Sequence, residues 1–415
     1  MIFSEDIKGL KLTGNELKKY RQKKKILDLL YHHDSLSGSA LSKKIGVSLP
    51  TALALLNELS QLKFVEAWGT GVSSGGRKPV MFRLLDESIY IIACELGRYE
   101  GKMIVYNSHN QPVSSKSYFE TSIDDNELVE KINSNAQKLI KEFEIDESRI
   151  FCIGLTMPGL IDEVKGINYT IKNSEYCNVK ERLETKFNKL VYINNDARMQ
   201  AYGEYIFGKA KGHLNAVVVN WNWGIGMGMI LNGKLYNGST GFAGELSHTK
   251  FVDDGDLCIC GKRGCLETVA SSNFLVKNAV NGINENVVSQ LTLGFKNRVE
   301  ELQPEDVINA AKLGDEFAIS LLNKIGLALG KGLSFTIQLL NPEIIVLGGV
   351  ISQANRFVLT PIQQSLNKYC LDKISSNVKI VISENWEQAG LLGVSAMLFQ
   401  QLFGDIYSEL KYESF

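Results

Sequence analysis

The spacing of apolar residues near the start of the chain predicts helices. A basic run at residues 18–25 leads into an apolar helical face at residues 26–31. Two shorter apolar segments with helical spacing follow, with Ser39 and Ser48 as their predicted N-caps. Gly46 ends the first of them, because glycine accepts the left-handed conformation that closes a helix. The chain therefore begins with one helix and then two short helices around a tight turn.

Two strand-like segments follow these helices. Residues 64–68 and 80–84 flank a polar loop that is rich in glycine. A pair of helices about a tight turn, followed by a β-hairpin, is typical of a winged helix-turn-helix. We predict this domain over residues 1–85, with residues 86–88 as the junction to the remainder.

From residue 89 onward, short apolar segments alternate with longer helical ones. This alternation predicts an α/β body, and at about 330 residues the body is long enough for two lobes. The predicted strands include residues 89–96, 150–155, 190–193, 216–219 and 344–347, and the predicted helices include 126–143 and 305–339.

The charge of the chain is divided unevenly between these two parts. Residues 1–85 hold 14 Lys and Arg against 7 Asp and Glu, whereas the whole chain has a net charge of −1. A basic N-terminal domain on an acidic body favours a polyanion partner for that domain alone, and we predict that it binds DNA. The second helix of such a domain enters the major groove, and a basic wing suits the minor groove. The candidate DNA contacts are Ser48, Thr51, Ala52, Arg77 and Lys78.

Other protein classes find no support in the sequence. The N-terminal segment has early acidic residues and no apolar core of a secretory signal, and no apolar stretch approaches the roughly 20 residues of a membrane span. We therefore expect a cytoplasmic protein with no membrane partner.

Three of the seven cysteines lie within eight residues. Cys258, Cys260 and Cys265 follow His248 closely, and two glycines within the loop would allow their sulfur atoms to converge. Three thiolates and one imidazole complete a tetrahedral zinc shell with no open position, so we expect a structural zinc ion. The alternative is a group of free cysteines that binds no metal.

The residues around this cluster closely resemble the signature of the ROK family, named for repressors, open reading frames and kinases. The resemblance rests on GELSH at 244–248 and CICGKRGCLE at 258–267, and it extends along the whole chain. Further matches are GGRKP at 75–79, MPG at 157–159, NDA at 195–197, NPEIIVLGG at 341–349 and AGLLG at 389–393. It implies an actin-like or hexokinase-like body over residues 89–415. The first lobe would span about 89–198 plus the C-terminal helix, and the second about 199–396.

The resemblance also implies a sugar site. A monosaccharide is held mainly through its hydroxyl groups, which carboxylates and amides can bind. The implied sugar contacts are Asn173, Asn195, Asp196, Glu245, His248 and Glu267, with one ring nitrogen of His248 for the zinc and the other for the sugar.

Family kinases would use Asp196 as the general base, but both phosphate loops depart from the kinase pattern. At the first loop, Arg98 and Tyr99 stand where small residues would let backbone amides reach phosphate. At the second, Trp223 stands where a threonine hydroxyl would meet it. We therefore expect a sugar-responsive regulator, a repressor by resemblance, without catalytic activity.

Three hypotheses remain at this point. The leading one is a regulator that binds operator DNA and a monosaccharide effector as a homodimer or homotetramer. The second is an active ATP-dependent sugar kinase with an appended DNA-binding domain. The third is a zinc-stabilised interaction module that does not bind DNA.

Overall fold

The N-terminal part of the chain folds as three helices on a small sheet. The computed structural model describes residues 14–72 and 78–403. The sheet has the strand order β1-β3-β2. The elements are α1 (Gly14–Tyr31), β1 (Leu36–Ser37), α2 (Gly38–Ile45), α3 (Leu49–Gln61), β2 (Val65–Thr70) and β3 (Val80–Leu84). This is the arrangement of a winged helix-turn-helix.

The helix ends in this unit follow the predicted turn chemistry, with one exception. Gly46 closes α2 in the left-handed conformation at φ 73°, and the Ser48 side chain caps α3 by accepting from the Thr51 amide. The predicted cap Ser39 is wrong, because α2 begins earlier and the Ser37 hydroxyl accepts from the Ala40 amide.

A five-stranded mixed sheet forms the first half of the body. Its order is β10-β7-β4-β5-β6, with β10, β7 and β4 parallel and β5 and β6 antiparallel. The strands are β4 (Tyr90–Leu96), β5 (Glu100–Asn107), β6 (Ser117–Glu120), β7 (Ile150–Met157) and β10 (Leu190–Asn195), and α4 (Leu128–Glu142) and α5 (Val179–Phe187) cover one face. The predicted strands at 89–96, 150–155 and 190–193 are confirmed.

A second five-stranded sheet forms the other half, in the order β13-β12-β11-β14-β15. Its strands are β11 (Ala216–Trp221), β12 (Ile225–Leu231), β13 (Lys234–Leu235), β14 (Ile344–Gly348) and β15 (Lys379–Ile382). The helices packed on it are α7 (Glu267–Ala270), α8 (Ser272–Asn284), α9 (Gln290–Phe295), α10 (Pro304–Lys312), α11 (Glu316–Leu340), α12 (Arg356–Tyr369) and α13 (Asp372–Ser375). The helix predicted over 305–339 is in fact two helices, α10 and α11, because Gly314 interrupts it at φ 89°.

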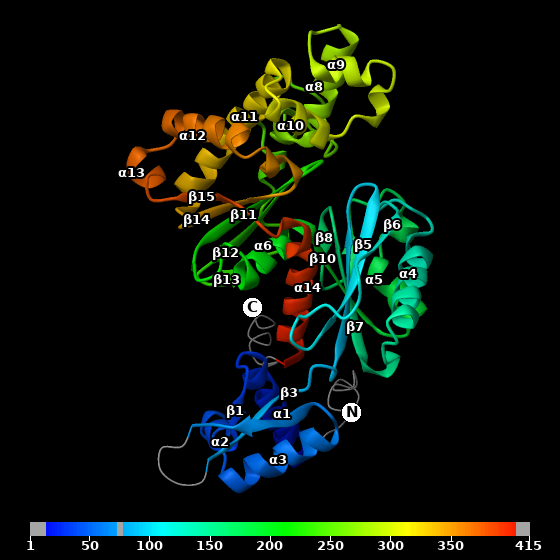
Figure 1. The fold of residues 1–415 in the computed structure, drawn as a ribbon, viewed down its shortest axis with the longest axis vertical. Coiled ribbons are helices and arrows are strands. Elements are labelled where there is room, and N and C mark those ends of the chain that lie inside the picture. Colours follow the sequence, from blue (N-terminus) through cyan, green and yellow to red (C-terminus); the bar gives the residue numbers. More distant parts are fainter. Residues whose placement is uncertain (1–13, 73–77, 404–415) are drawn as a thin grey trace.

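Two helices connect these sheets to one another. They are α6 (Asp196–Phe207) and α14 (Trp386–Phe403), and they pack side by side in the middle of the molecule (Figure 1). The lower end of α14 extends to the N-terminal unit, where it contacts α1. A two-lobed body therefore stands above a small helical unit, and α14 reaches both.

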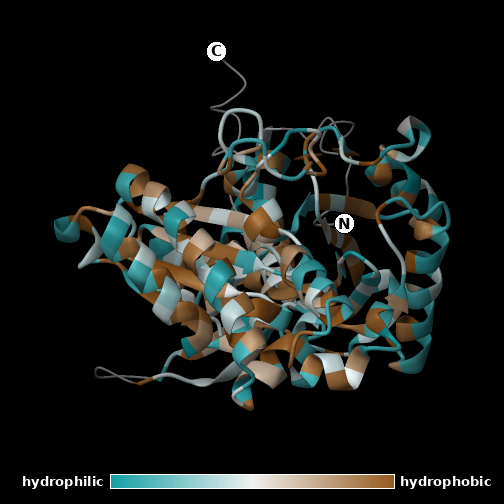
Figure 2. Cartoon of the chain, turned by 90° about the horizontal axis from the view of Figure 1, so that it is seen from above, coloured by the Kyte–Doolittle hydropathy of each residue, from teal (hydrophilic) through white to brown (hydrophobic). Residues whose placement is uncertain are grey.

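The outer helices have polar and apolar faces, as helices that cover a core do. In Figure 2 they carry alternating hydrophilic and hydrophobic bands, and the strands beneath them are mostly hydrophobic. Within residues 14–72 and 78–403, no helix combines the length and the apolar character that crossing a membrane requires.

Candidate functional site

The four predicted metal ligands lie together. The Sγ atoms of Cys260 and Cys265 are 3.6 Å apart, and Cys258 Sγ is 3.5 Å from His248 Nδ1. All four donor atoms lie within 4.8 Å of one another. A tetrahedral ion with sulfur at about 2.3 Å and nitrogen at about 2.0 Å would place sulfur and nitrogen roughly 3.5 Å apart and two sulfurs roughly 3.8 Å apart, so the donor set fits a metal ion.

Glycine allows the cysteine loop to fold back on itself. Gly261 and Gly264 both have positive φ, at 83° and 74°. A methyl group on Gly264 would lie 1.8 Å from the Val252 carbonyl oxygen, so no other residue fits there without moving the backbone.

His248 joins this cluster to the acidic residues beside it. Its Nδ1 faces Cys258, whereas its Nε2 lies 3.8 Å from Glu245 Oε2. Glu267 begins α7 two residues after Cys265, and its carboxylate accepts from the Ile225 amide. Both carboxylates therefore lie close to His248, which connects them to the cysteine loop.

Asn195 and Asp196 lie where β10 passes into α6. The Asn195 side chain caps α6 by accepting from the Arg198 amide at 3.1 Å, and it donates to the Gly159 carbonyl oxygen at 3.2 Å. Asp196 Oδ2 accepts from Asn220 Nδ2 at 3.3 Å. The Asn195 side chain is therefore used by two backbone groups, those of Gly159 and Arg198, whereas Asp196 carries the carboxylate that a ligand could bind.

The carboxyl groups of this site have raised pKa values. Burial is the main cause of a rise in the pKa of Asp196 to about 6, and Glu95 and Glu245 add to it. Burial also raises the pKa of Glu245 and of Glu267, against the opposing effect of His248. Several incompletely paired, partly buried acids in one place are typical of a site that awaits a ligand.

Asn173 lies apart from this pattern. It is exposed and precedes a short 3₁₀ helix, η3 (Ser174–Tyr176), where its Oδ1 accepts from the Glu175 amide. That capping bond explains its position without a ligand, and its role in sugar binding stays a prediction.

Arg198 is a residue of the site that the sequence did not reveal. Its side chain is only 2% exposed, and its Nη1 has no hydrogen-bond partner among the described residues. Glu163, Glu245 and Asp196 act electrostatically on it. The only sequence signal is its place directly after the Asn-Asp-Ala motif, in the first turn of α6.

Side chains of the two loops that the resemblance relates to phosphate loops, at residues 95–99 and 222–226, contact one another. Glu95 Oε1 pairs with Lys102 Nζ at 2.9 Å. The Arg98 guanidinium lies 5.1 Å from the Tyr99 ring and 5.4 Å from the Trp223 ring, and the two rings meet edge to face. Since Tyr99 follows β4 and Trp223 follows β11, this cluster joins the two lobes.

The candidate DNA-contacting residues divide into three groups. Ser48, Thr51 and Lys78 are exposed, and the hydroxyls of Ser48 and Thr51 are 2.8 Å apart. Ala52 is fully buried, because it points into the core beneath α3, so its predicted contact with bases is wrong. Arg77 lies outside the described residues.

Two exposed side chains on these helices were missed. Asn57 lies on the outer face of α3, and Lys44 lies near the C-terminus of α2. Asn57 lies six residues after Thr51, about 120° around the helix axis, so helical spacing from Thr51 does not point to it. The predicted pair Thr51 and Ala52, being adjacent, cannot share one face either.

These features define the class to which the protein belongs: a winged helix joined to a two-lobed body whose Cys/His loop carries acidic residues. The ROK family model matches residues 91–401, and the chain belongs to the ROK family. The xylose repressor of Bacillus spizizenii strain W23 is 28% identical over 407 residues, which cover 92% of this chain and 96% of the repressor. A crystal structure of a ROK family transcriptional regulator, a homologue of the E. coli MLC protein, matches with a TM-score of 0.76 and 26% identity over 93% of this chain and 97% of that one.

Kinases of the family match a smaller share of this chain. A glucokinase of Halalkalibacterium halodurans is 34% identical over 258 residues, which cover 61% of this chain and 78% of the kinase. The two regulators, by contrast, match more than nine-tenths of this chain, with coverage that extends into the N-terminal unit.

Proposed function

We propose that this protein is a sugar-responsive transcriptional repressor. The winged helix binds operator DNA, and a monosaccharide or a derivative of one binds among Asp196, Glu245, His248 and Glu267. The observation that carries this proposal is that the acidic cluster, braced by the Cys/His loop, shares one chain with a DNA-binding unit.

The chemistry of the acidic cluster suits a polyol. With a pKa of about 6, Asp196 is mostly ionised at pH 7.5 and accepts a hydrogen bond from a sugar hydroxyl. Glu245 and Glu267 lie close to His248, so the cluster offers several acceptors to neighbouring hydroxyls. A ligand that fills these bonds relieves the unfavourable burial of the carboxylates.

The metal that fits the four-residue cluster is zinc, held by His248, Cys258, Cys260 and Cys265. Four protein ligands leave no position for water, so the ion supplies rigidity to the loop and no catalytic group. With Nδ1 on the metal, the Nε2–H of His248 remains free to donate to Glu245 or to a sugar.

DNA binding by the winged helix would use α3 in the major groove. Ser48 and Thr51 present small hydroxyls at the N-terminal end of α3, and Asn57 presents an amide further along the same helix. Lys44, Lys78 and Arg77 would neutralise phosphates or enter the minor groove. Binding to an operator with two-fold symmetry favours a homodimer, or a homotetramer built from two dimers.

The second candidate function is an active sugar kinase. The retained Asp196, in the position of a general base, favours it. Against it, the two loops that the resemblance relates to phosphate binding carry Arg98, Tyr99 and Trp223 in place of small residues, and Lys102 pairs with Glu95.

Electrophoretic mobility shift with the DNA upstream of the protein's own gene tests the proposal. We expect a complex that weakens steeply with salt and is released by D-xylose, D-glucose or N-acetyl-D-glucosamine. Binding of the sugar is measured separately by calorimetry. A protein that binds one of these sugars but no DNA contradicts the proposal.

A further inference from the structure

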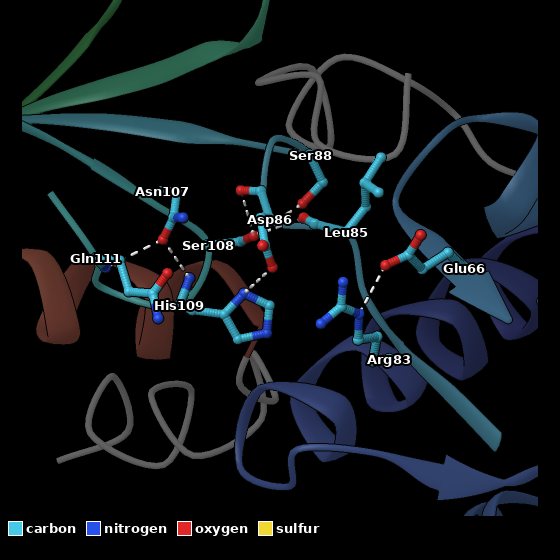
Figure 3. A network of polar contacts seen from close by, with 9 residues as sticks. All are labelled: Glu66, Arg83, Leu85, Asp86, Ser88, Asn107, Ser108, His109 and Gln111. Carbon is cyan, nitrogen blue, oxygen red and sulfur yellow. Dashed lines mark hydrogen bonds and ion pairs between the residues drawn. The ribbon is translucent and has the colours of Figure 1, made fainter. Parts of the chain in front are cut away.

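A single turn of the body is fixed to the linker that leads from the DNA-binding unit. This turn, Asn107–Gln111, follows β5 and lies beside the linker Leu85–Ser88 (Figure 3). Ser108 Oγ donates to the Leu85 carbonyl oxygen at 2.8 Å and accepts from Ser88 Oγ at 3.2 Å. His109 Nδ1 lies 3.1 Å from Asp86 Oδ1.

The turn is also rigid within itself. Asn107 Oδ1 accepts from the His109 and Gln111 amides, both at 3.0 Å. Asn110 has φ 56°, a left-handed conformation that asparagine tolerates better than most residues. The side chain of Asn110 therefore has a defined direction.

Asn110 contacts two helices from different parts of the protein. Its Nδ2 donates to the hydroxyl of Tyr31, the last residue of α1, at 2.7 Å. Its Oδ1 accepts from Ser395 Oγ, in α14, at 2.9 Å. Both polar atoms of one amide thus tie the DNA-binding unit to the helix that crosses the body.

The end of α14 packs against the same tyrosine. The ring centroids of Phe399 and Phe403 lie 5.7 and 5.4 Å from that of Tyr31, and the two phenylalanines stack on each other at 5.8 Å. Lys24, in α1, donates to the Gln401 carbonyl oxygen at 3.5 Å. Apolar and polar contacts therefore couple α14 to α1.

The other part of α14 contacts α6 backbone to backbone. A methyl group on Gly393 would lie 1.8 Å from the Met199 carbonyl oxygen, and one on Gly203 would lie 1.9 Å from the Ala389 carbonyl oxygen. Helices this close move together, because no side chains lie between them to absorb a shift. Since α6 begins at Asp196, a displacement at the sugar site reaches α14 directly.

We propose that Asn110, held between Tyr31 and Ser395, is the positioning residue that transmits occupation of the acidic site to the DNA-binding unit. A ligand on Asp196 shifts α6, α14 follows, and the Asn110 amide carries the shift to α1 and the linker. The inference rests on the proposed function, since it concerns how that site controls DNA binding.

Three substitutions in the full-length protein test it. Asn110→Gly keeps the left-handed backbone and removes the amide, while Tyr31→Phe and Ser395→Ala each remove one hydroxyl. Ser365→Ala is the matched control, because Ser365 is likewise buried and its hydroxyl donates to a helix carbonyl, that of Leu327 at 2.7 Å.

The sugar used is the one of D-xylose, D-glucose and N-acetyl-D-glucosamine that binds the wild type. The affinity of each variant for the upstream DNA is measured with and without this sugar. We expect that sugar to weaken DNA binding at least tenfold in the wild type and in Ser365→Ala, and less than threefold in Asn110→Gly. The dissociation constants for the sugar itself should stay within about twofold, and sugar-dependent hydrogen exchange in α1 should disappear in Asn110→Gly.

Each of the remaining outcomes contradicts a different part of the proposal. If Asn110→Gly is released by sugar as the wild type is, the coupling role of Asn110 is wrong. If Ser365→Ala also loses the response, the loss reflects general destabilisation and the assignment to Asn110 fails. If the wild type binds no DNA, or binds DNA that none of the three sugars releases, the proposed function fails, and the inference fails with it.

Discussion

At the residue scale, the acidic site is a place where ligand binding and stability oppose each other. Asp196 is buried enough to raise its pKa, and its neighbours Glu95 and Glu245 are acids as well. The folded protein therefore holds a carboxylate in surroundings that disfavour its charge. A group with this environment destabilises the fold until a ligand binds it.

Substitution of Asp196 separates the two effects. A raised pKa means that the folded state holds the proton more tightly than the unfolded chain, so the wild type loses stability as the pH rises from about 4 to about 6. At pH 7.5, the free energy of unfolding of Asp196→Asn, measured by urea denaturation, should therefore exceed that of the wild type by about 1–3 kcal/mol. At pH 4 the gain should be small. Calorimetry should show lost sugar binding. Glu300→Gln, an exposed change, serves as the control, and an equal gain for Asp196→Asn at both pH values would contradict the explanation.

Cys260, which we propose as a metal ligand, gives a second residue-scale prediction. Its side chain is exposed, so Cys260→Ser removes a ligand without opening a cavity in the core. We expect the wild type to contain about one zinc per chain and the variant to lose it, with sugar affinity reduced at least tenfold. Elemental analysis and calorimetry measure both quantities, and Cys177→Ser, outside the cluster, is the control. A variant without zinc that binds sugar normally would show that the ion does not brace the site.

At the scale of elements, the contact between α6 and α14 determines how rigidly the lobes are joined. The two helices meet through Gly203 and Gly393, so their backbones touch. Gly393→Ala would place a methyl group against backbone atoms that cannot move independently, and it should lower the free energy of unfolding by about 2–3 kcal/mol. Denaturation with urea measures this. Gly294→Ala in α9, where nothing lies within 4 Å, should be neutral or stabilising by up to about 1 kcal/mol. If Gly393→Ala left the free energy of unfolding unchanged, α6 and α14 would have room to separate.

The helix α3, which we propose enters the major groove, provides another prediction at this scale. Asn57 is exposed on α3, and asparagine can pair with an adenine edge in the major groove. Asn57→Ala should weaken binding to the operator about tenfold or more and leave binding to unrelated DNA nearly unchanged. Fluorescence anisotropy with both duplexes measures this, with Gln61→Ala at the far end of α3 as the control. Equal losses on both duplexes would assign Asn57 to phosphate contacts instead.

At the scale of the whole molecule, a small cluster of side chains joins the two lobes. Arg98 and Tyr99 come from the first lobe and Trp223 from the second, and Lys102 neutralises Glu95. The fold of the body is shared with kinases of the family. Fold alone therefore does not decide between regulator and enzyme.

This arrangement predicts a protein that binds sugar without turning over ATP. A coupled assay for ADP should give no sugar-dependent rate above the protein-free background, and ATP should not raise the melting temperature, whereas the bound sugar should. A glucokinase of the family is the positive control. Sugar-dependent ADP release would favour the kinase hypothesis.

The sequence by itself determined the features that depend on local chemistry. The alternation of apolar segments predicted some strands of each sheet, namely β4, β7, β10, β11 and β14. Gly46 and Ser48 predicted helix ends, because periodicity and turn conformation are properties of short segments. Likewise His248 and the three cysteines could be grouped by spacing alone, since three of the four ligands lie on one loop.

Only the tertiary structure decided what depends on distant segments meeting. In the structure, Ala52 is buried and the cap of α2 is Ser37 in place of Ser39. Arg198 lies near Glu163, Glu245 and Asp196, and Arg98 lies near the ring of Trp223. The contact of Asn110 with Tyr31 and Ser395 joins residues 79 and 285 positions away along the chain. No local pattern encodes such pairs, because their meeting is fixed by how whole helices pack.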